Sequence, residues 1–406
     1  MRYAGMQLLQ ADVTSDLSLA QRVAAVDAQG HCQRCGNAQL IALPNGERYC
    51  PACINLGRVT SGDWLYRFAA PPVAPTAMTW SGQLTKAQAQ ASARLVAAVA
   101  AGQDYLLWAV TGAGKTEMLF AAIASVLAQG QRVAVAAPRV DVVRELAPRL
   151  QAAFAHTAMA VRYGGAPWPT QDCPLVVCTT HQLLRYYQAF DLLVVDEVDA
   201  FPFAHDQALA HAVNAAARGA KVWLSATPPQ ALRRLGHSVL PRRFHGYPLP
   251  VPQVQLATPP QRLTGKIRTQ LNQWVGDYQV LVFVPDISWL AALTKTLTDV
   301  LGVAVAGVHA NDPQRAEKVA AFRAGELQVL VATTILERGV TIPHCAVVVL
   351  AADSPRFGQA ALIQMAGRAG RAASSPDDPV VYVARHYTRS IQLAIREIKL
   401  LNAMEG

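Results

Sequence analysis

Long apolar runs are absent from this sequence of 406 residues. No window approaches the ~18 uninterrupted apolar residues that a membrane-spanning helix needs, so we expect no membrane span. Segment 1–12 also has no long apolar stretch and reaches an acid at Asp12, which argues against a secretion signal. We therefore expect a cytoplasmic protein, and peripheral docking at the inner face of the cell membrane stays open.

Charged residues are scarce, at 16%, whereas hydrophobic residues make up 52%. This composition argues against wholesale disorder, and the length suggests two or three domains. Within the small charged fraction, 36 Lys and Arg exceed 27 Asp and Glu, which gives a formal charge of +9. A basic surplus favours a polyanionic partner such as nucleic acid, although a basic enzyme without such a partner has the same balance.

A disulfide framework is also not indicated, because the seven cysteines are odd in number and four of them cluster. Cys32 and Cys35 form one CxxC pair, and Cys50 and Cys53 form a second pair after fourteen intervening residues. This spacing predicts a structural four-thiolate Zn²⁺ site in a module at 31–55, with an iron–sulfur cluster or free cysteines as the alternatives. The other three cysteines lie in or beside apolar strands and are expected to be inert: Cys173, Cys178 and Cys345.

Residues 69–76 are rich in Ala and Pro, which predicts a linker after an N-terminal region at 1–75. From about residue 80, short apolar runs alternate with helix-length segments, as in parallel sheets covered by helices. We expect an α/β fold with one lobe at 76–245 and another at 246–406. A proline-rich hinge is expected at 241–262 and a last helix at 387–406. The expected strands are 104–110, 132–138, 175–180, 191–196 and 221–226 in the first lobe, and 279–284, 303–308, 327–333, 346–351 and 379–384 in the second.

The expected strand 104–110 leads into TGAGKT and then a helix-like segment at 117–129, which is the context of a phosphate-binding loop. The loop amides and the helix N-terminus favour anionic phosphate. Lys115 is expected to reach the terminal phosphates of ATP, and Thr116 to bind Mg²⁺. The predicted nucleotide-binding set is Thr111, Gly112, Ala113, Gly114, Lys115 and Thr116.

A second acidic motif, DEVD, follows the apolar strand at 191–196. Ligands of α/β proteins bind at the carboxyl ends of strands. We expect Asp196 to hold Mg²⁺ and Glu197 to act as the general base toward water. Taken alone, such acids are also typical of a helix N-cap.

In the second lobe, residues 364–371 read QMAGRAGR. Cleavage of the γ-phosphate spreads negative charge over its oxygens, which a planar guanidinium stabilises. We expect Arg371 to be the arginine finger and Arg368 a second phosphate contact, with a basic helix start as the alternative.

The order TGAGKT, DEVD, SAT at 225–227, TTILERG at 333–339 and QMAGRAGR resembles superfamily-two helicases, which have two tandem RecA-like lobes. The resemblance implies that SAT links hydrolysis to lobe movement, that Glu337 and Gly339 face ATP, and that Gln88 reads adenine. Trp80 beside it is as well explained by core packing. Nucleic-acid backbone contacts are implied for Arg139, Thr179, Thr180, Thr333 and Thr334.

Four cysteines ahead of the first lobe and the aromatic residues Phe201 and Phe203 after DEVD resemble the ComFA family, the late-competence DNA-uptake ATPases of Gram-positive bacteria. The resemblance implies an ATPase stimulated by single-stranded DNA, with a ComFC-like protein and a ComEC-like membrane channel as partners. A homo-oligomer stays open. We hypothesise that the zinc module and the two phenylalanines help to engage DNA or couple it to ATP, with core packing of the phenylalanines as the alternative.

Two rival functions remain at this point. The first is a PriA-like duplex-unwinding helicase for repair or replication restart, although PriA carries its cysteine-rich insert inside the second lobe. The second is a zinc-containing nucleic-acid-binding protein with a decayed ATPase. Intact Lys115, Glu197 and Arg371 argue against the second rival.

Overall fold

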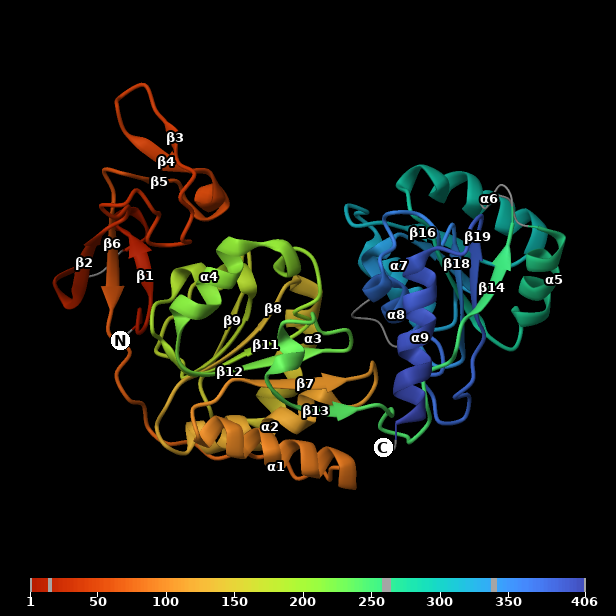
Figure 1. Ribbon diagram of the computed structural model, residues 1–406, viewed down its shortest axis with the longest axis horizontal. Coiled ribbons are helices and arrows are strands. Elements are labelled where there is room, and N and C mark those ends of the chain that lie inside the picture. The colour runs from red at the N-terminus through yellow and green to blue at the C-terminus, as the bar shows by residue number, and fades with distance from the viewer. Residues whose placement is uncertain (1, 14–16, 258–263, 337–341, 405–406) are drawn as a thin grey trace. The chain divides into compact units, whose positions relative to one another are not determined.

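The computed structural model describes residues 2–13, 17–257, 264–336 and 342–404 (Figure 1). The chain divides into two compact units, one of Met1–Trp108 with Lys115–Val239 and the other of Ala109–Gly114 with Leu240–Gly406. The predicted α/β class with two parallel-sheet lobes is confirmed. Among the described residues, no helix is both long and apolar enough to span a membrane.

The first unit contains a seven-stranded sheet in the order β13-β7-β12-β11-β8-β10-β9. Pairing is parallel from β7 through to β9. The apolar strands β7, β8 and β10 are buried at every position, as expected for a sheet with helices on both faces. The strands are β7 (Tyr105–Ala109), β8 (Val133–Ala137), β9 (Met159–Arg162), β10 (Leu175–Thr179), β11 (Phe190–Val195), β12 (Ala217–Ser225) and β13 (Gly236–Leu240), and the helices are α1 (Lys86–Ala100), α2 (Lys115–Leu127), α3 (Val140–Ala153) and α4 (Gln207–Ala216).

The second unit has a six-stranded, wholly parallel sheet in the order β14-β19-β18-β15-β17-β16. The proline-rich segment that the sequence assigned to a hinge contains the edge strand β14, so that assignment was wrong in part. The strands are β14 (Gln253–Leu256), β15 (Gln279–Phe283), β16 (Val305–Val308), β17 (Val329–Ala332), β18 (Cys345–Leu350) and β19 (Val380–Ala384), and the helices are α5 (Gly265–Trp274), α6 (Leu290–Leu301), α7 (Arg315–Arg323), α8 (Gln359–Ala366) and α9 (Arg389–Ala403).

The N-terminal region forms two small antiparallel sheets, β1-β6-β2 and β3-β4-β5. Two of these strands lie within residues 1–30, for which the sequence predicted no element. Both pair with β6, about forty or more residues further along the chain, so no local pattern announces them. The strands are β1 (Gln7–Leu9), β2 (Ala20–Ala24), β3 (Ile41–Ala42), β4 (Arg48–Cys50), β5 (Val59–Thr60) and β6 (Trp64–Phe68).

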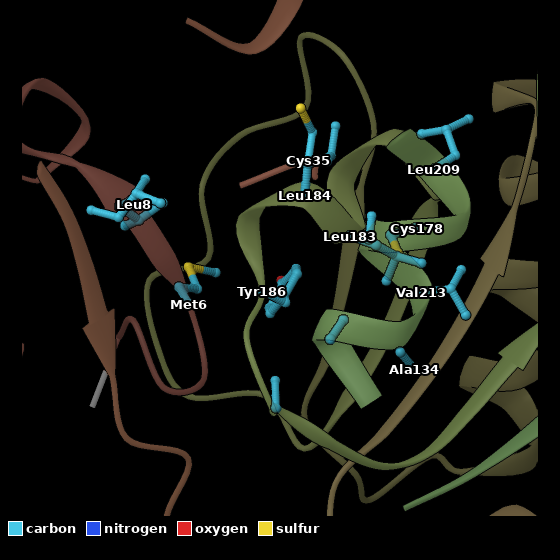
Figure 2. Close-up of a cluster of buried hydrophobic side chains, with 14 of the residues drawn as sticks. Met6, Leu8, Cys35, Ala134, Cys178, Leu183, Leu184, Tyr186, Leu209 and Val213 are labelled. Carbon is cyan, nitrogen blue, oxygen red and sulfur yellow. The ribbon is translucent and has the colours of Figure 1, made fainter. Parts of the chain in front are cut away.

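The N-terminal region shares a hydrophobic core with the first parallel sheet (Figure 2). Buried side chains of β1, the cysteine module, the segment 183–186 and α4 form one cluster. Met6 forms an antiparallel bridge to Tyr186. Gln7 Nε2 donates to the carbonyl oxygens of Leu184 and Tyr186, each at 3.3 Å. The N-terminal region is therefore an integral part of the first unit.

We predict that Leu8→Ala lowers the free energy of unfolding by about 2–5 kcal/mol, because it leaves a cavity in this shared core, where Leu8 is 1% exposed. Leu19→Ala is the matched control, with an expected change within about 0.5 kcal/mol at a side chain that is 61% exposed. Urea denaturation of the full chain, followed by tryptophan fluorescence, measures both changes. Equally small losses would contradict a shared core.

Candidate active site and metal centre

Three motifs follow strands of the seven-stranded sheet and lie along one edge of it. Parallel strands end at the same edge, where α/β proteins bind their ligands. The phosphate-binding loop follows β7, the DEVD acids follow β11, and SAT begins at the last residue of β12. Ser225 pairs in register with Trp108, and Asp196 N–H donates to the Ala136 carbonyl oxygen at 2.8 Å. Residues separated by up to about 120 positions are thereby held on neighbouring strands.

The phosphate-binding loop has the backbone that anion binding requires. Gly112 and Gly114 have φ of +82° and +75°, in the left-handed region that glycine adopts without strain. Helix α2 begins at Lys115, so its free N–H groups face the loop. Thr116 is buried and Lys115 is half-buried. The arrangement suits binding of a nucleotide phosphate.

The first two DEVD acids lie directly beyond β11. Asp196 Oδ1 accepts a hydrogen bond from the Glu197 N–H at 2.8 Å. Glu197 has φ +51°, which is uncommon for a residue other than glycine and turns its side chain out of the strand direction. Backbone strain of this kind clusters at functional sites. Both carboxyl groups are half-buried, a suitable setting for a metal ligand and a base.

Asp199, the last acid of DEVD, was missed by the sequence analysis. Its Oδ1 accepts from Ser225 Oγ and its Oδ2 from Thr227 Oγ1, each at 2.6 Å. Ser225 Oγ in turn accepts from the Thr227 N–H at 2.9 Å. The acidic loop and SAT are thus one hydrogen-bonded network on adjacent strands. The sequence did carry a signal for this network. It was a third acid after the two catalytic candidates, followed later in the chain by the two hydroxyl residues of SAT.

The arginine motif lies at the end of α8 in the second unit. Arg368 is buried, and Arg371 Nε donates to the Gly367 carbonyl oxygen at 2.9 Å. Gly370 has φ +66°, and its N–H donates to Asp378 Oδ2 at 2.8 Å. The turn that carries both arginines is therefore fixed by hydrogen bonds of its own backbone.

Arg243 is a buried cation that the sequence analysis did not identify. Its guanidinium donates to the carbonyl oxygens of Gly370 and Gly367. The pKa of Arg243 is lowered to about 10, chiefly by burial and also by the neighbouring positive charge of Arg368. The side chain remains charged at neutral pH and holds the arginine-bearing turn through these two hydrogen bonds.

The first residues of the phosphate-binding loop belong to the second unit and contact this turn. Thr111 Oγ1 donates to the Gly367 carbonyl oxygen at 3.4 Å, and the Phe244 N–H donates to that of Gly112 at 2.9 Å. A Cβ at Gly367 would come 2.2 Å from Thr111 Oγ1, so this contact requires glycine. Ala113 is buried in the same loop.

Gln88, expected to read adenine, lies in the first turn of α1. Its Oε1 accepts from the Thr85 N–H at 2.9 Å in a capping box, and the residue is buried. Trp80 packs edge-on against Phe120 with ring centroids 5.3 Å apart. The tryptophan therefore belongs to the packing of the first unit. Two further nucleotide-site candidates, Glu337 and Gly339, lie outside the described residues.

The residues expected to contact nucleic acid differ in accessibility. Arg139 forms a paired contact with Asp141, at 3.2 and 2.9 Å. Thr179 and Thr180 are buried at the end of β10. Thr333 and Thr334 are half-buried just after β17. All of these residues lie at or just after strand ends, and the side chains of the first threonine pair are buried.

The four clustered cysteines fit a zinc ion. All four sulfur atoms are buried and lie within 4.8 Å of one another. The sulfurs of Cys32 and Cys53 are 3.8 Å apart and those of Cys35 and Cys50 are 3.4 Å apart. A tetrahedral site with Zn–S bonds of about 2.3 Å places its sulfurs about 3.8 Å apart. The donor set is closed, as in structural sites.

Hydrogen bonds and one buried cation surround the cluster. Hydrogen bonding among the four sulfurs lowers the pKa of the Cys32 and Cys50 thiols and raises the pKa of the Cys35 and Cys53 thiols. Asn37 Nδ2 also donates to the Cys50 sulfur at 3.5 Å. Arg34 lies between the first two cysteines and is 1% exposed. Its guanidinium donates to the carbonyl oxygens of Cys53 and Gly57, at 3.1 and 2.8 Å. Its charge would offset part of the negative charge of a four-thiolate zinc centre.

The remaining cysteines are separate from this cluster. Cys178 and Cys345 are buried in strands, and burial raises the pKa of each thiol to about 12. Cys173 is half-buried, and desolvation raises its thiol pKa as well. All three are therefore thiols at neutral pH, in agreement with the expectation that they are inert.

We predict about one zinc ion per chain in the purified protein, falling to less than about 0.2 in Cys50→Ser/Cys53→Ser, because two thiolates cannot close the coordination shell. Cys173→Ser keeps the wild-type content, since its sulfur lies outside the cluster. Inductively coupled plasma mass spectrometry measures the content. Iron in place of zinc, or equal loss in the control, would contradict the assignment.

The comparisons with known proteins agree with this geometry. Residues 85–235 match the DEAD/DEAH box helicase family, and residues 266–373 match the helicase conserved C-terminal domain. By structure, the chain is similar to Dbp5 of S. cerevisiae bound to RNA and ADP BeF3, with a TM-score of 0.59 at 17% identity over 79% of this chain and 88% of that one. At that identity the likeness shows the fold alone.

Two curated relatives extend over nearly the whole sequence. Competence protein ComFA of Bacillus subtilis (strain 168) is 41% identical over 92% of this chain and 86% of its own length. Competence protein ComFA of Streptococcus pneumoniae (strain ATCC BAA-255 / R6) is 38% identical over 100% of this chain and 98% of its own. The chain therefore belongs to the ComFA family and carries the ATPase domains of a superfamily-two helicase.

Proposed function

We propose that this protein is an ATP-driven motor that moves single-stranded DNA during its uptake by competent cells. The observation that carries the proposal is the gathering of a phosphate-binding loop, paired acids and SAT at one sheet edge, in a chain similar over its whole length to competence proteins. Partners would be a ComFC-like protein and a ComEC-like membrane channel, reached from the inner face of the membrane.

In this proposal, Lys115 and the loop amides bind the phosphates of ATP. Thr116 and Asp196 would hold Mg²⁺, which neutralises phosphate charge when bound. Glu197 takes a proton from water as its oxygen attacks the γ-phosphorus and the bond to ADP breaks. Arg371, supported by Arg368, stabilises the charge that develops on the phosphate oxygens.

Asp199 would transmit the movement that follows ATP hydrolysis from the acidic loop to SAT. It shares one short loop with Asp196 and Glu197 and accepts both SAT hydroxyl groups. A shift of the acidic loop on phosphate release would therefore move the segment after β12 as well. This is a physical basis for the role that SAT has in the superfamily.

DNA would be gripped through its phosphates along the strand ends. Thr333, Thr334 and Arg139 are the candidate contacts, the last after release from Asp141. Because the hydroxyl of Thr180 is 0% exposed, contacts at that loop would use backbone groups or the adjacent His181. The N-terminal module packs on the turn that follows, so zinc loading would support this loop.

We predict that Lys115→Ala lowers ATP turnover at least about 100-fold, because phosphate charge loses its cation. Lys295→Ala, an exposed lysine of α6, is the matched control and should leave turnover unchanged. Phosphate release is measured with single-stranded DNA, duplex DNA and RNA in parallel, and strand displacement on a forked duplex. Absence of stimulation by single-stranded DNA would overturn the proposal, and separation of the duplex would favour the PriA-like alternative.

Phe201 is the better candidate for a DNA-stacking aromatic after the acids. It is 81% exposed, whereas Phe203 is half-buried against Trp223 with ring centroids 6.3 Å apart. We predict that Phe201→Ala lowers stimulation by single-stranded DNA at least about 5-fold at unchanged basal turnover, since base stacking contributes about 1–3 kcal/mol. Phe201→Tyr retains stimulation, and Phe203→Ala mainly lowers the thermal midpoint. Unchanged stimulation in Phe201→Ala would leave the coupling idea without support.

A further inference from the structure

The turn between β19 and α9 exposes a group of basic and aromatic side chains outside the helicase motifs. Arg385, His386 and Arg389 are exposed, and Tyr387 is 52% exposed. We call these four residues the basic turn. We propose that the basic turn is a further contact for the backbone and bases of single-stranded nucleic acid. This inference rests on the proposed function for the identity of the ligand.

The basic turn has a local surplus of positive charge. Residues 379–396 contain three arginines and no acid. In the part of the chain that the structure describes, neither Arg385 nor Arg389 forms an ion pair. The nearby Asp353 uses Oδ2 to accept from the N–H groups of Arg385 and His386, at 3.1 and 3.3 Å. That carboxylate thus fixes the backbone of the turn and leaves the guanidinium groups exposed.

The start of α9 adds positive potential at the same place. Arg389 is the first residue of this fifteen-residue helix, and Thr388 caps it by accepting the Ile391 N–H at 3.5 Å. No acid lies in the first turn. A helix dipole disfavours a cation at this end and favours an anion. A bound phosphate would stabilise the helix end and the arginine together.

The basic turn shares a sheet edge with the expected DNA contacts of the second unit. β19 and β17 are parallel members of one sheet, so the turn and Thr333 both follow carboxyl ends. Two strands lie between them, which gives three strand spacings or about 14 Å. Adjacent phosphates of a stacked strand lie about 3.4 Å apart along its axis, so a few nucleotides span that separation.

The side chains suit a single strand better than a duplex. Guanidinium groups bind phosphate oxygens as a fork, with no demand on sequence. An exposed tyrosine can stack on an unpaired base, which a duplex does not offer. The combination predicts binding that is independent of sequence. The guanidinium contacts to phosphate would be salt-sensitive, and the stacking of tyrosine on a base would be salt-insensitive.

Equilibrium binding of the full-length, zinc-loaded protein to a fluorescein-labelled oligo-dT of twenty nucleotides tests the inference. We predict that Arg385→Gln/Arg389→Gln raises Kd about 10-fold and reduces the slope of log K against log salt by about 1.4, at about 0.7 per phosphate contact. Tyr387→Ala raises Kd about 5-fold without changing the slope, and Tyr387→Phe retains wild-type binding.

Arg396→Gln/Lys399→Gln is the matched control, because it removes the same charge from exposed positions later on α9. It should change Kd less than about 2-fold. Wild-type affinity and slope in the Arg385/Arg389 variant, or an equal loss in the control, would overturn the inference. A loss confined to duplex DNA would overturn it too. Failure of the wild type itself to bind the oligonucleotide would instead refute the proposed function.

Discussion

Parallel pairing of the strands is the constraint on which the candidate active site and the expected DNA contacts depend. A parallel sheet brings the carboxyl ends of distant strands to one edge, and helices on its faces force those strands to be continuously apolar. In the first unit this brings SAT beside β7 and the DEVD acids beside β8. Asp199 then joins two strand ends through side chains alone. Buried strands fix the edge, and the short polar residues beyond them are the candidates for the chemistry.

The N-terminal region shows how a small metal module can become part of a larger lobe. Its two small sheets are too small to bury a core by themselves, and they share one with the segment 183–186 and α4. Arg185 pairs with Asp12 at 3.1 Å, and a side chain at Gly36 would come 2.6 Å from His211 Nδ1. Zinc bound by the four cysteines would therefore stabilise more than its own loop. It would fix a surface that packs against the turn after β10, a segment close to the expected DNA contacts.

Much of this architecture was predictable from sequence because its signals are local. All ten predicted strands are present, since each is a continuous apolar run bounded by turn residues. The phosphate-binding loop and the cysteine pairs were predictable for the same reason, because spacing alone defines them. Strands β1 and β2 were not predictable, since their partner β6 lies far along the chain and their pattern is weak. The role of Arg243 was not predictable either. In the sequence, a buried arginine in a proline-rich segment looks the same as an exposed one, and only the structure reveals its carbonyl partners.

Burial shows that a residue within a motif does not always have a side chain that can reach the ligand. Thr180 occupies the expected loop yet is fully buried, and Arg139 is held by Asp141. By contrast, Phe201 and Tyr387 belong to no helicase motif and are among the exposed large side chains. A sequence motif marks where the backbone passes close to the ligand, because the strand ends of the fold fix the path of the backbone there. The groups that touch a flexible polyanion need only charge, a ring and access to solvent, so they can stand at many positions on the same edge. Exposure combined with unneutralised charge is therefore the better criterion for such contacts, and sequence alone cannot supply it.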